Sequence, residues 1–190
     1  VDVGADVIAV AHHRDDNIET FFLNLLRGTG IAGLTGMSYR NDCIVRPMLA
    51  CRRVEIEQYL RDRHLDNVTD STNLQNDFKR NRLRNVILPM IEDQFPGASD
   101  AIAMTIANLQ GNEAVYRSRI FEIEKRYKKE NIIEIAQLVA EEDGAETLLF
   151  ELLRPYGFNF THVRDIITSK EHSGKRFYAD SYVALLDRGR

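Results

Sequence analysis

The sequence contains little cysteine and no long hydrophobic run. Its two cysteines, Cys43 and Cys51, are too few for a disulfide scaffold, and their spacing differs from that of a CxxC metal or redox site. We interpret both as ordinary thiols in a protein from a reducing compartment. No apolar run approaches the ~20 residues that a membrane-spanning helix needs, and no signal peptide is visible. These absences indicate a soluble, cytoplasmic protein.

The length and the charge leave several classes of protein open. With 190 residues, of which 44% are hydrophobic, the chain is long enough for one domain and part of another, or for two small domains. The net charge of -4 argues weakly against nucleic acid as a partner. Local basic clusters bind nucleic acid regardless of the total charge, so their position along the chain is more informative.

A strand, a polar turn and a helix are expected near the start of the chain. Val7–Ala11 is apolar and partly β-branched, which predicts a central strand buried on both faces. After the turn, an apolar stripe at helical spacing predicts an amphipathic helix that ends at Gly28. The stripe consists of Ile18, Phe21, Phe22, Leu25 and Leu26. Because ligands bind at the carboxyl ends of strands in open α/β sheets, the polar turn is a candidate site.

The polar turn holds two histidines and three acids, namely His12, His13, Asp15, Asp16 and Glu19. One interpretation is helix capping, since Asp15 or Asp16 suits an N-cap and Asp16-x-x-Glu19 has capping-box spacing. A cap needs only one acid, however. If Asp16 and Glu19 face one side, they form a negative pocket for Mg²⁺ or for the ammonium group of an amine substrate. The histidines then hydrogen-bond a phosphate or a purine, or bind a metal other than zinc, because adjacent histidines on an extended segment point apart.

The segment after this helix is rich in glycine, with Gly28, Gly30, Gly33 and Gly36. Glycine permits positive φ and close backbone approach, so the backbone amides of this loop are candidates for contacting a nucleotide. The alternative is a plain helix stop followed by a turn. Arg27 favours the first interpretation, because we expect its guanidinium to reach the same crevice.

A basic run begins at Lys79 and includes Arg80, Arg82 and Arg84. A solvated helix end is one explanation. Cations at a helix start oppose the macrodipole, however, and binding of nucleotide or RNA phosphates explains their position better. At about 100° per residue, Arg80 and Arg84 lie on one side of the helix and Arg82 on the other.

The remaining elements follow from hydrophobic spacing and turn residues. Two helices are expected to present an apolar face to the core. The residues on these faces are Ile56, Tyr59 and Leu60 in the first helix, and Leu83, Val86, Ile87, Met90 and Ile91 in the next. The expected elements are a strand at 43–47, helices at 52–64 and from 80 onward, a long helix after 95–97, a strand at 132–138, helices at 146–153 and 162–168, and a hairpin of 177–179 with 182–186.

These residues form an ordered series of motifs. The motifs are His12-His13-x-Asp15-Asp16-x-x-Glu19-Thr20, Leu26-Arg27-Gly28-Thr29-Gly30, Gly33-Leu34-x-Gly36-Met37, Arg46-Pro47, Asp70-Ser71-x-Asn73 and Arg80-Asn81-Arg82-Leu83-Arg84. In kind and order they closely resemble the tRNA(Ile)-lysidine synthase family, the MesJ-type proteins, which are N-type PP-loop ATPases. The resemblance covers roughly the first half of the chain closely and the second half more loosely.

The resemblance implies an α/β fold with three parts. These are the C-terminal part of a PP-loop ATPase parallel-sheet domain (adenine nucleotide alpha hydrolase-like) at 1–96, a long linker helix at 97–130, and a small α+β domain that binds tRNA and substrate at 131–190. Members of the family begin with a Ser-Gly-Gly-x-Asp-Ser loop that grips the ATP phosphates, and this sequence contains no such loop. We therefore expect a fragment that is inactive alone.

The resemblance also implies an activity. Members of the family ligate free L-lysine to C2 of the wobble cytidine of an isoleucine tRNA with a CAU anticodon, through an adenylated intermediate, using ATP and Mg²⁺. A homodimer is compatible with this activity. Catalytic roles then fall to Asp16, Glu19, Arg80 and Arg84, with Asp16 as the candidate Mg²⁺ ligand. Substrate or nucleotide binding falls to His12, His13, Asp15, Arg27, Gly28, Gly30 and Arg82.

Two other classes of function stay open at this stage. A metal-dependent phosphoesterase would use His12, His13, Asp15 and Asp16 and would need further ligands from other strands. A non-catalytic RNA-binding module would consist of the long helix and the C-terminal unit.

Overall fold

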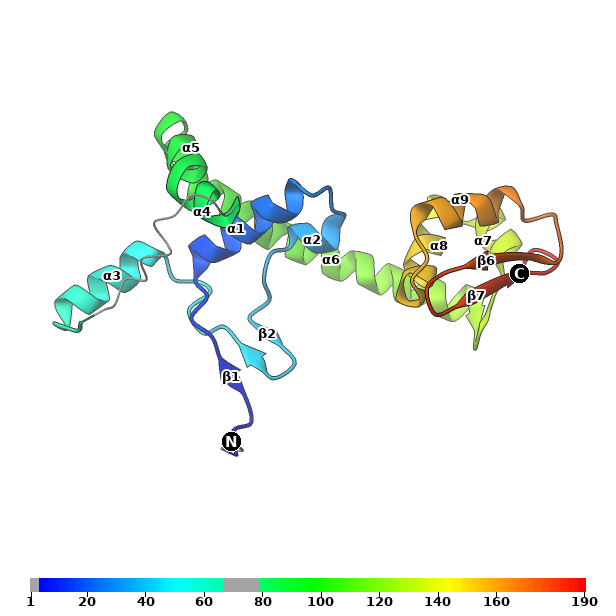
Figure 1. Cartoon of the computed structure of the whole chain (residues 1–190), viewed down its shortest axis with the longest axis horizontal. Helices are drawn as coiled ribbons and strands as arrows, with labels where there is room; N and C mark the ends of the chain where they lie inside the picture. The colour runs from blue at the N-terminus through cyan, green and yellow to red at the C-terminus, as the bar shows by residue number, and fades with distance from the viewer. Residues whose placement is uncertain (1–3, 67–78) are drawn as a thin grey trace. The chain divides into compact units, whose positions relative to one another are not determined.

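The computed structural model describes residues 4–66 and 79–190, and the chain forms two compact units, 1–113 and 114–190 (Figure 1). Helix α6 (Ala98–Tyr127) runs through the division between the units. The domain boundaries expected at residues 96 and 130 stay a prediction. The Asp70-Ser71-x-Asn73 motif lies outside the described residues.

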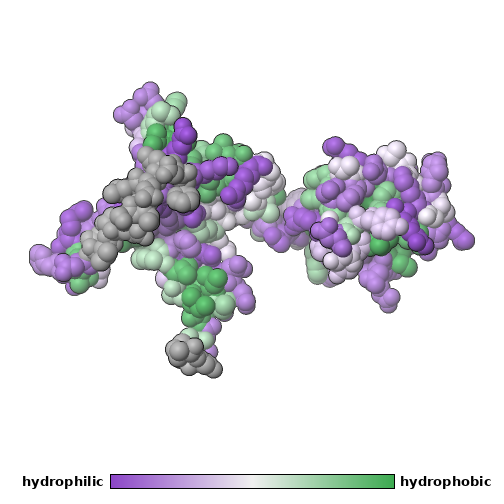
Figure 2. Space-filling view, in the orientation of Figure 1, coloured by the Kyte–Doolittle hydropathy of each residue, from purple (hydrophilic) through white to green (hydrophobic). Residues whose placement is uncertain are grey.

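The first unit contains a small mixed sheet with strand order β1-β3-β2. Strand β1 (Ile8–Ala9) runs parallel to β3 (Ile44–Val45), with Ile8 opposite Ile44, and β2 (Arg40–Asn41) runs antiparallel to β3. The expected strand at 43–47 is confirmed, although it is shorter. The expectation of a central strand buried on both faces at Val7–Ala11 is wrong, because β1 lies at the sheet edge and Ile8 is 57% exposed. Figure 2 shows hydrophobic surface over β1.

Helix α1 (Arg14–Leu25) is the amphipathic helix that the sequence predicts, and Gly28 follows it with a φ of +73°. Its buried residues are Asp16, Asn17, Ile18 and Glu19, so the enclosed face is largely polar. The prediction that Leu25 and Leu26 extend the apolar stripe into the core is wrong, since both are exposed. They lie at the helix end, beyond the reach of the elements that cover its first two turns.

Helix α1 contacts α2 (Ile31–Leu34), α4 (Lys79–Arg82) and the π-helical segment η2 (Leu83–Ile87). Helix α4, η2 and α5 (Leu88–Gln94) form one continuous helical run. Helix α3 consists of Arg53–Asp62. The wider turn at η2 precedes Pro89, which has no N–H to donate to the preceding turn.

Three core-facing predictions for these helices are wrong. Tyr59, Val86 and Met90 are exposed, because the described residues place no layer over those helix faces. The prediction that Leu83 faces the core is confirmed, because Leu83 is 2% exposed and lies in the segment that contacts α1.

The second unit is a small α+β domain built on the last turns of α6. It contains the hairpin β4 (Lys128–Lys129) and β5 (Ile132–Ile133), helices α7 (Ile135–Glu141), α8 (Ala145–Leu153) and α9 (Phe160–Thr168), the 3-10 turn η3 (Arg154–Tyr156), and the hairpin β6 (Lys175–Tyr178) and β7 (Val183–Leu186). Its core includes Ile123, Tyr127, Leu138, Leu149, Val163, Ile166, Phe177 and Leu186.

The predicted helices at 146–153 and 162–168 and the predicted C-terminal hairpin are confirmed. The predicted strand at 132–138 is wrong beyond Ile133, because α7 begins at Ile135. Ile135 and Leu138 are both buried, three residues apart, so burial on the helical period outweighs the β-branched composition of this stretch. Within residues 4–66 and 79–190, no helix has the length and hydropathy of a membrane span.

Candidate active site

The candidate site lies where α1 meets the run that begins with α4, and an arginine–carboxylate cluster holds the two together. Arg84 donates from Nε to Glu19 Oε1 at 2.6 Å and from Nη2 to Glu19 Oε2 at 2.9 Å. The same Nη2 also donates to Asp16 Oδ1 at 2.8 Å. Arg80 donates to the Thr20 hydroxyl at 2.7 Å, and its Nε lies 3.3 Å from Glu19 Oε2. The cluster therefore brings together all four residues expected to be catalytic.

The first turn of α1 explains why Asp16 points toward Arg84. His13 is the N-cap residue, and its backbone N–H donates to Asp16 Oδ2 at 3.0 Å. Asp16 thus uses one carboxylate oxygen to cap its own helix and the other to bind Arg84. Asp16 therefore takes part in capping, one of the two interpretations that the sequence leaves open, and also pairs with an arginine that the sequence did not indicate as its partner. Glu19 takes no part in a capping box, since its carboxylate binds arginine.

Asp15 anchors the start of α3. Its Oδ2 accepts a hydrogen bond from the backbone N–H of Arg53 at 2.9 Å and lies 3.6 Å from His13 Nδ1. The interaction with His13, followed by the bond from Arg53, outweighs burial and lowers the pKa of Asp15 to about 2. Asp15 therefore stays ionised throughout the physiological range.

The cluster is enclosed, so its charges interact strongly. Glu19 is only 1% exposed, and a carboxylate at that depth requires a partner. The hydrogen bond to Glu19 raises the pKa of Arg84, so that guanidinium stays charged. Two arginines facing two carboxylates leave the group close to neutral, with the charges fixed in position.

A pocket of about 320 Å³ opens beside the cluster within the first unit. Its wall carries both signs of charge, which suits a small zwitterionic or phosphorylated ligand better than an apolar one. The charged residues that line it are Asp15, Glu19, Arg53, Arg84 and Glu92.

The other residues singled out from the sequence lie apart from the cluster. Arg27 lies two residues beyond the C-terminal end of α1, and that end is about 14 Å along the axis from Asp16 at 1.5 Å per residue. Gly28 and Gly30 are in the same exposed turn, and Gly30 caps α2. Arg82 is exposed. Its expected place on the side of the helix opposite Arg80 and Arg84 stays a prediction.

His12 is half-buried before α1, and its Nδ1 has no hydrogen-bond partner among the described residues. The binding roles of His12, Arg27, Gly28, Gly30 and Arg82 stay predictions.

The residues that sequence reasoning missed act through contacts with α1. The side chain of Asn17 accepts a hydrogen bond from Met37 N–H at 2.6 Å, and Asn24 donates to the Gly33 carbonyl at 2.8 Å, so α1 holds the second half of the glycine-rich loop. Arg14 and Arg52 both bind Asp100 in the first turn of α6. A single sequence gives little sign of such pairs, because most of the partners are distant along the chain, for example 20 positions apart for Asn17 and Met37 and 86 for Arg14 and Asp100.

The described residues do not form a metal cage. No group of three His, Cys, Asp or Glu side chains in residues 4–66 and 79–190 is placed to hold an ion. Asp16 and Glu19 already bind Arg84, which opposes a cation at the same oxygens. The metal-phosphoesterase alternative therefore finds no support, and a protein-only Mg²⁺ site does not fit the described residues.

Comparisons with known proteins agree with the motif series. Residues 1–91 match the PP-loop domain, and residues 125–190 match the TilS substrate binding domain. The chain is 41% identical over 191 residues to a tRNA(Ile)-lysidine synthase of Porphyromonas gingivalis, covering 100% of this chain and 42% of that protein. For the Bacteroides thetaiotaomicron and Clostridium perfringens proteins of the same name, identity is 41% and 32%, covering 97% and 96% of this chain and 43% and 41% of theirs. The chain thus spans about two fifths of the length of these curated relatives.

Proposed function

Because the chain belongs to the tRNA(Ile)-lysidine synthase family, we propose that this protein uses ATP to ligate L-lysine to C2 of the wobble cytidine of an isoleucine tRNA. The observation that carries the proposal is the enclosed cluster of Asp16, Glu19, Arg80 and Arg84, formed by motifs that are 60 or more residues apart. The resemblance to the family rests on the same motifs. The proposed tRNA carries the CAU anticodon.

The proposed chemistry has two steps. The C2 oxygen of cytidine attacks the α-phosphate of ATP, which forms an O–P bond and releases diphosphate. The ε-amine of lysine, after losing a proton, then attacks C2 and expels AMP. Both steps develop negative charge on phosphate oxygens, which fixed guanidinium groups stabilise. Arg80 and Arg84 are the candidates for this role.

Asp16 and Glu19 are the candidates for receiving the lysine ammonium group. A carboxylate has about four acceptor sites, and the bonds to arginine and to the helix N-terminus leave some of them unfilled. Arg84 also holds both carboxylates in place, so they do not need to reorganise when the ammonium group arrives. An incoming ammonium group would compete with Arg84 for the carboxylate oxygens of Asp16 and Glu19. Lysine binding would therefore depend on the position of Arg84.

The nucleotide and the ion are part of the proposal. ATP is the co-substrate, and His12, His13, Arg27, Gly28 and Gly30 are the residues offered for its base and phosphates. Mg²⁺ would accompany ATP through the phosphate oxygens. We also propose that the second substrate is free L-lysine, that the protein is cytoplasmic and that it forms a homodimer.

A labelling assay tests the function. The protein as its gene encodes it is incubated with ATP, Mg²⁺, radiolabelled lysine and the isoleucine tRNA. We expect lysine to enter the tRNA with release of AMP and diphosphate, and we expect no labelling of the same tRNA with uridine at the wobble position. Absence of incorporation, or incorporation that does not require ATP, would overturn the proposal.

A further inference from the structure

The second unit contains an aromatic pocket of about 260 Å³ that the proposed chemistry does not use. It lies between the β4–β5 hairpin, the segment after α8 and strand β7. Its wall includes Lys128, Asn131, Tyr156, Phe158, Tyr182 and Val183. All of these residues belong to the 114–190 unit, so the pocket depends on that unit alone.

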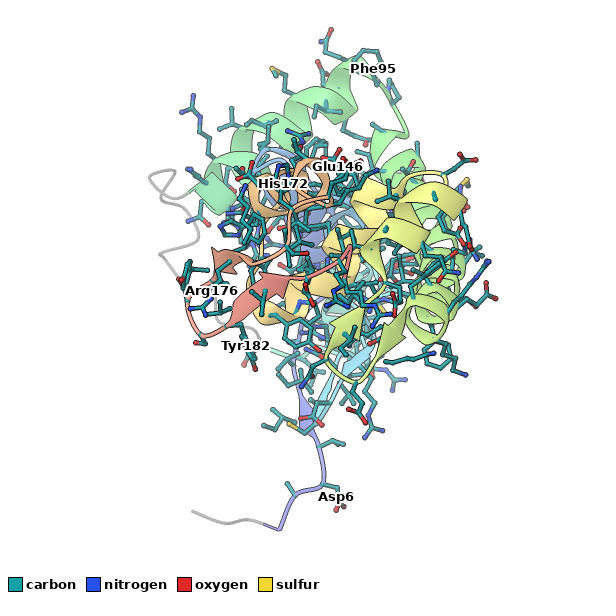
Figure 3. The ribbon with its side chains drawn as sticks, turned by 90° about the vertical axis from the view of Figure 1, so that its right-hand side faces the viewer. Asp6, Phe95, Glu146, His172, Arg176 and Tyr182 are labelled. Atoms are coloured by element: carbon teal, nitrogen blue, oxygen red, sulfur yellow. The ribbon has the colours of Figure 1, made fainter. Side chains whose placement is uncertain are left out.

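Of the aromatic rings that line the pocket, that of Tyr182 is about half exposed to solvent. Tyr156 and Tyr182 meet edge to face, with centroids 5.2 Å apart and planes at 82°, and Phe158 is buried. Tyr182 remains 52% exposed and stands on the C-terminal hairpin (Figure 3). An exposed aromatic ring whose position is fixed by a second ring provides a stacking surface at low entropic cost.

A cation and an amide lie beside these rings. Lys128 is held by Glu124 at 2.6 Å, and its Nζ is 5.3 Å from the centroid of the Tyr156 ring. Asn131 lies in the turn of the β4–β5 hairpin, next to Glu130, which has a φ of +51°. The neighbouring Lys129 is exposed on the same hairpin. The pocket thus combines a ring for stacking, an amide for hydrogen bonding and positive charge at its rim.

We propose that this pocket receives one unstacked nucleobase of the tRNA substrate, with Tyr182 stacking on the base and Lys128 near the adjoining phosphate. The inference rests on the proposed function, which supplies the RNA. A pocket of about 260 Å³ lies below the roughly 300–1,000 Å³ of pockets for drug-sized ligands, so it suits a single planar group. Proteins recognise RNA largely through bases that leave the stack and lie on aromatic side chains.

A protein strand is the competing occupant, since β7 has a free edge in this two-stranded sheet. The polar groups argue against it. A strand added at an edge is bound by backbone hydrogen bonds, which do not require an amide, a lysine and a half-exposed ring around one pocket. Tyr178 serves as the matched control, because it is a tyrosine on the same hairpin, is 63% exposed and is not part of the pocket wall.

Fluorescence tests the inference as the difference in emission between each tryptophan variant and the parent protein, and these 190 residues themselves contain no tryptophan. In the protein as its gene encodes it, Tyr182→Trp introduces one reporter in this chain at the pocket, and Tyr178→Trp introduces one on the same hairpin outside it. We expect the isoleucine tRNA to quench the emission of Tyr182→Trp, since a stacked base quenches indole, and to leave that of Tyr178→Trp almost unchanged. Equal quenching at both positions, or none at position 182 while tRNA is bound, overturns the inference.

Binding measurements supply the second test. Tyr182→Ala should weaken tRNA binding about tenfold, whereas Tyr182→Phe and Tyr178→Ala should stay within about twofold of the parent. The salt dependence of binding should not change in Tyr182→Ala, because the ring carries no charge.

The outcomes separate this inference from the proposed function. If lysidine forms normally and Tyr182→Ala binds tRNA like the parent, the base pocket is wrong and the function stands. If Tyr182→Ala instead changes the oligomeric state in light scattering without changing tRNA affinity, the occupant is protein and the inference is overturned. If the parent protein neither binds nor modifies the tRNA, both fail.

Discussion

Arg84 binds the carboxylate of Glu19 with both arms of its guanidinium group, at 2.6 Å and 2.9 Å, although 65 residues separate the two in sequence. Glu19 is fully enclosed and Arg84 only partly exposed, so the pair lies mostly out of water. A bidentate bond of this kind fixes distance and orientation together. The pair therefore determines how α1 and the π-helical segment meet.

The stability of the first unit should depend on this pair. Among residues 4–66 and 79–190, Arg84→Ala leaves Glu19 buried with the longer contact to Arg80, and we expect a loss of about 3 kcal/mol in the free energy of unfolding. Chemical denaturation measures this loss, with Arg82→Ala as the exposed control, which should change stability by less than about 0.5 kcal/mol. Adding Glu19→Gln to Arg84→Ala should recover part of the loss, because the more deeply buried of the two carboxylates that Arg84 binds is then uncharged. Equal losses in the Arg82 and Arg84 variants would show that the pair is not what holds the helices.

Lysine kinetics should separate capping from catalysis at the two acids. In the protein as its gene encodes it, Glu19→Gln should raise the KM for lysine or lower kcat by about tenfold or more, since the substituted amide cannot neutralise an ammonium group. Asp16→Asn should act in the same direction while keeping an oxygen for the His13 N–H. Circular dichroism controls for the helix. Unchanged lysine kinetics in both variants would leave the carboxylates with a structural role only.

The three arginines of the basic run should differ in how their loss affects tRNA. Arg82 is exposed, so Arg82→Ala should reduce the slope of log affinity against log salt by about one, with kcat unchanged. Arg80→Ala and Arg84→Ala should lower kcat and leave that slope nearly constant, because transition-state charge is what they are proposed to meet. Filter binding at several salt concentrations, together with turnover, measures both quantities. If none of the three variants changes either quantity, the run is a solvated helix end.

Acid should remove the contribution of Asp15 to stability. The pKa of this group is lowered in the folded chain from an ordinary value of 3.8 to about 2, by His13 first and by the N–H of Arg53. The stabilisation is therefore complete above about pH 4 and is lost as the pH falls toward 2. Because Asp15 is partly exposed, solvent screening keeps the contribution below about 1 kcal/mol. Asp15→Asn should flatten this part of the stability profile in urea titrations between pH 5 and pH 2, and an unchanged profile would contradict the assignment.

Gly36 should not tolerate a side chain. Its φ is +66°, and a Cβ there would lie 2.2 Å from Asn17 Oδ1, the atom that accepts the Met37 N–H. We expect Gly36→Ala to lower the free energy of unfolding by about 1–3 kcal/mol. Gly30→Ala is the control, because a Cβ at that position meets nothing within 4 Å. Similar stability in the two variants would show that the loop is not fixed by Asn17.

The sequence by itself determined the local elements and the family. Helix α1, helix α6 and the C-terminal hairpin follow from periodicity and turn residues, because those signals depend on neighbours a few positions away. Helical spacing also placed Arg80 and Arg84 on one side of their helix. The order of the motifs identified the family before any contact was known.

Only the tertiary structure decided which groups meet and which faces are covered. From the sequence alone, Asp16 and Glu19 were expected to be unpaired carboxylates, whereas in the fold both bind Arg84. It presented Val7–Ala11 and Leu25 as core, and the fold leaves Ile8 and Leu25 exposed. Burial and ion pairing depend on elements that are distant in sequence, and no local pattern encodes which of those elements will lie over a given helix face.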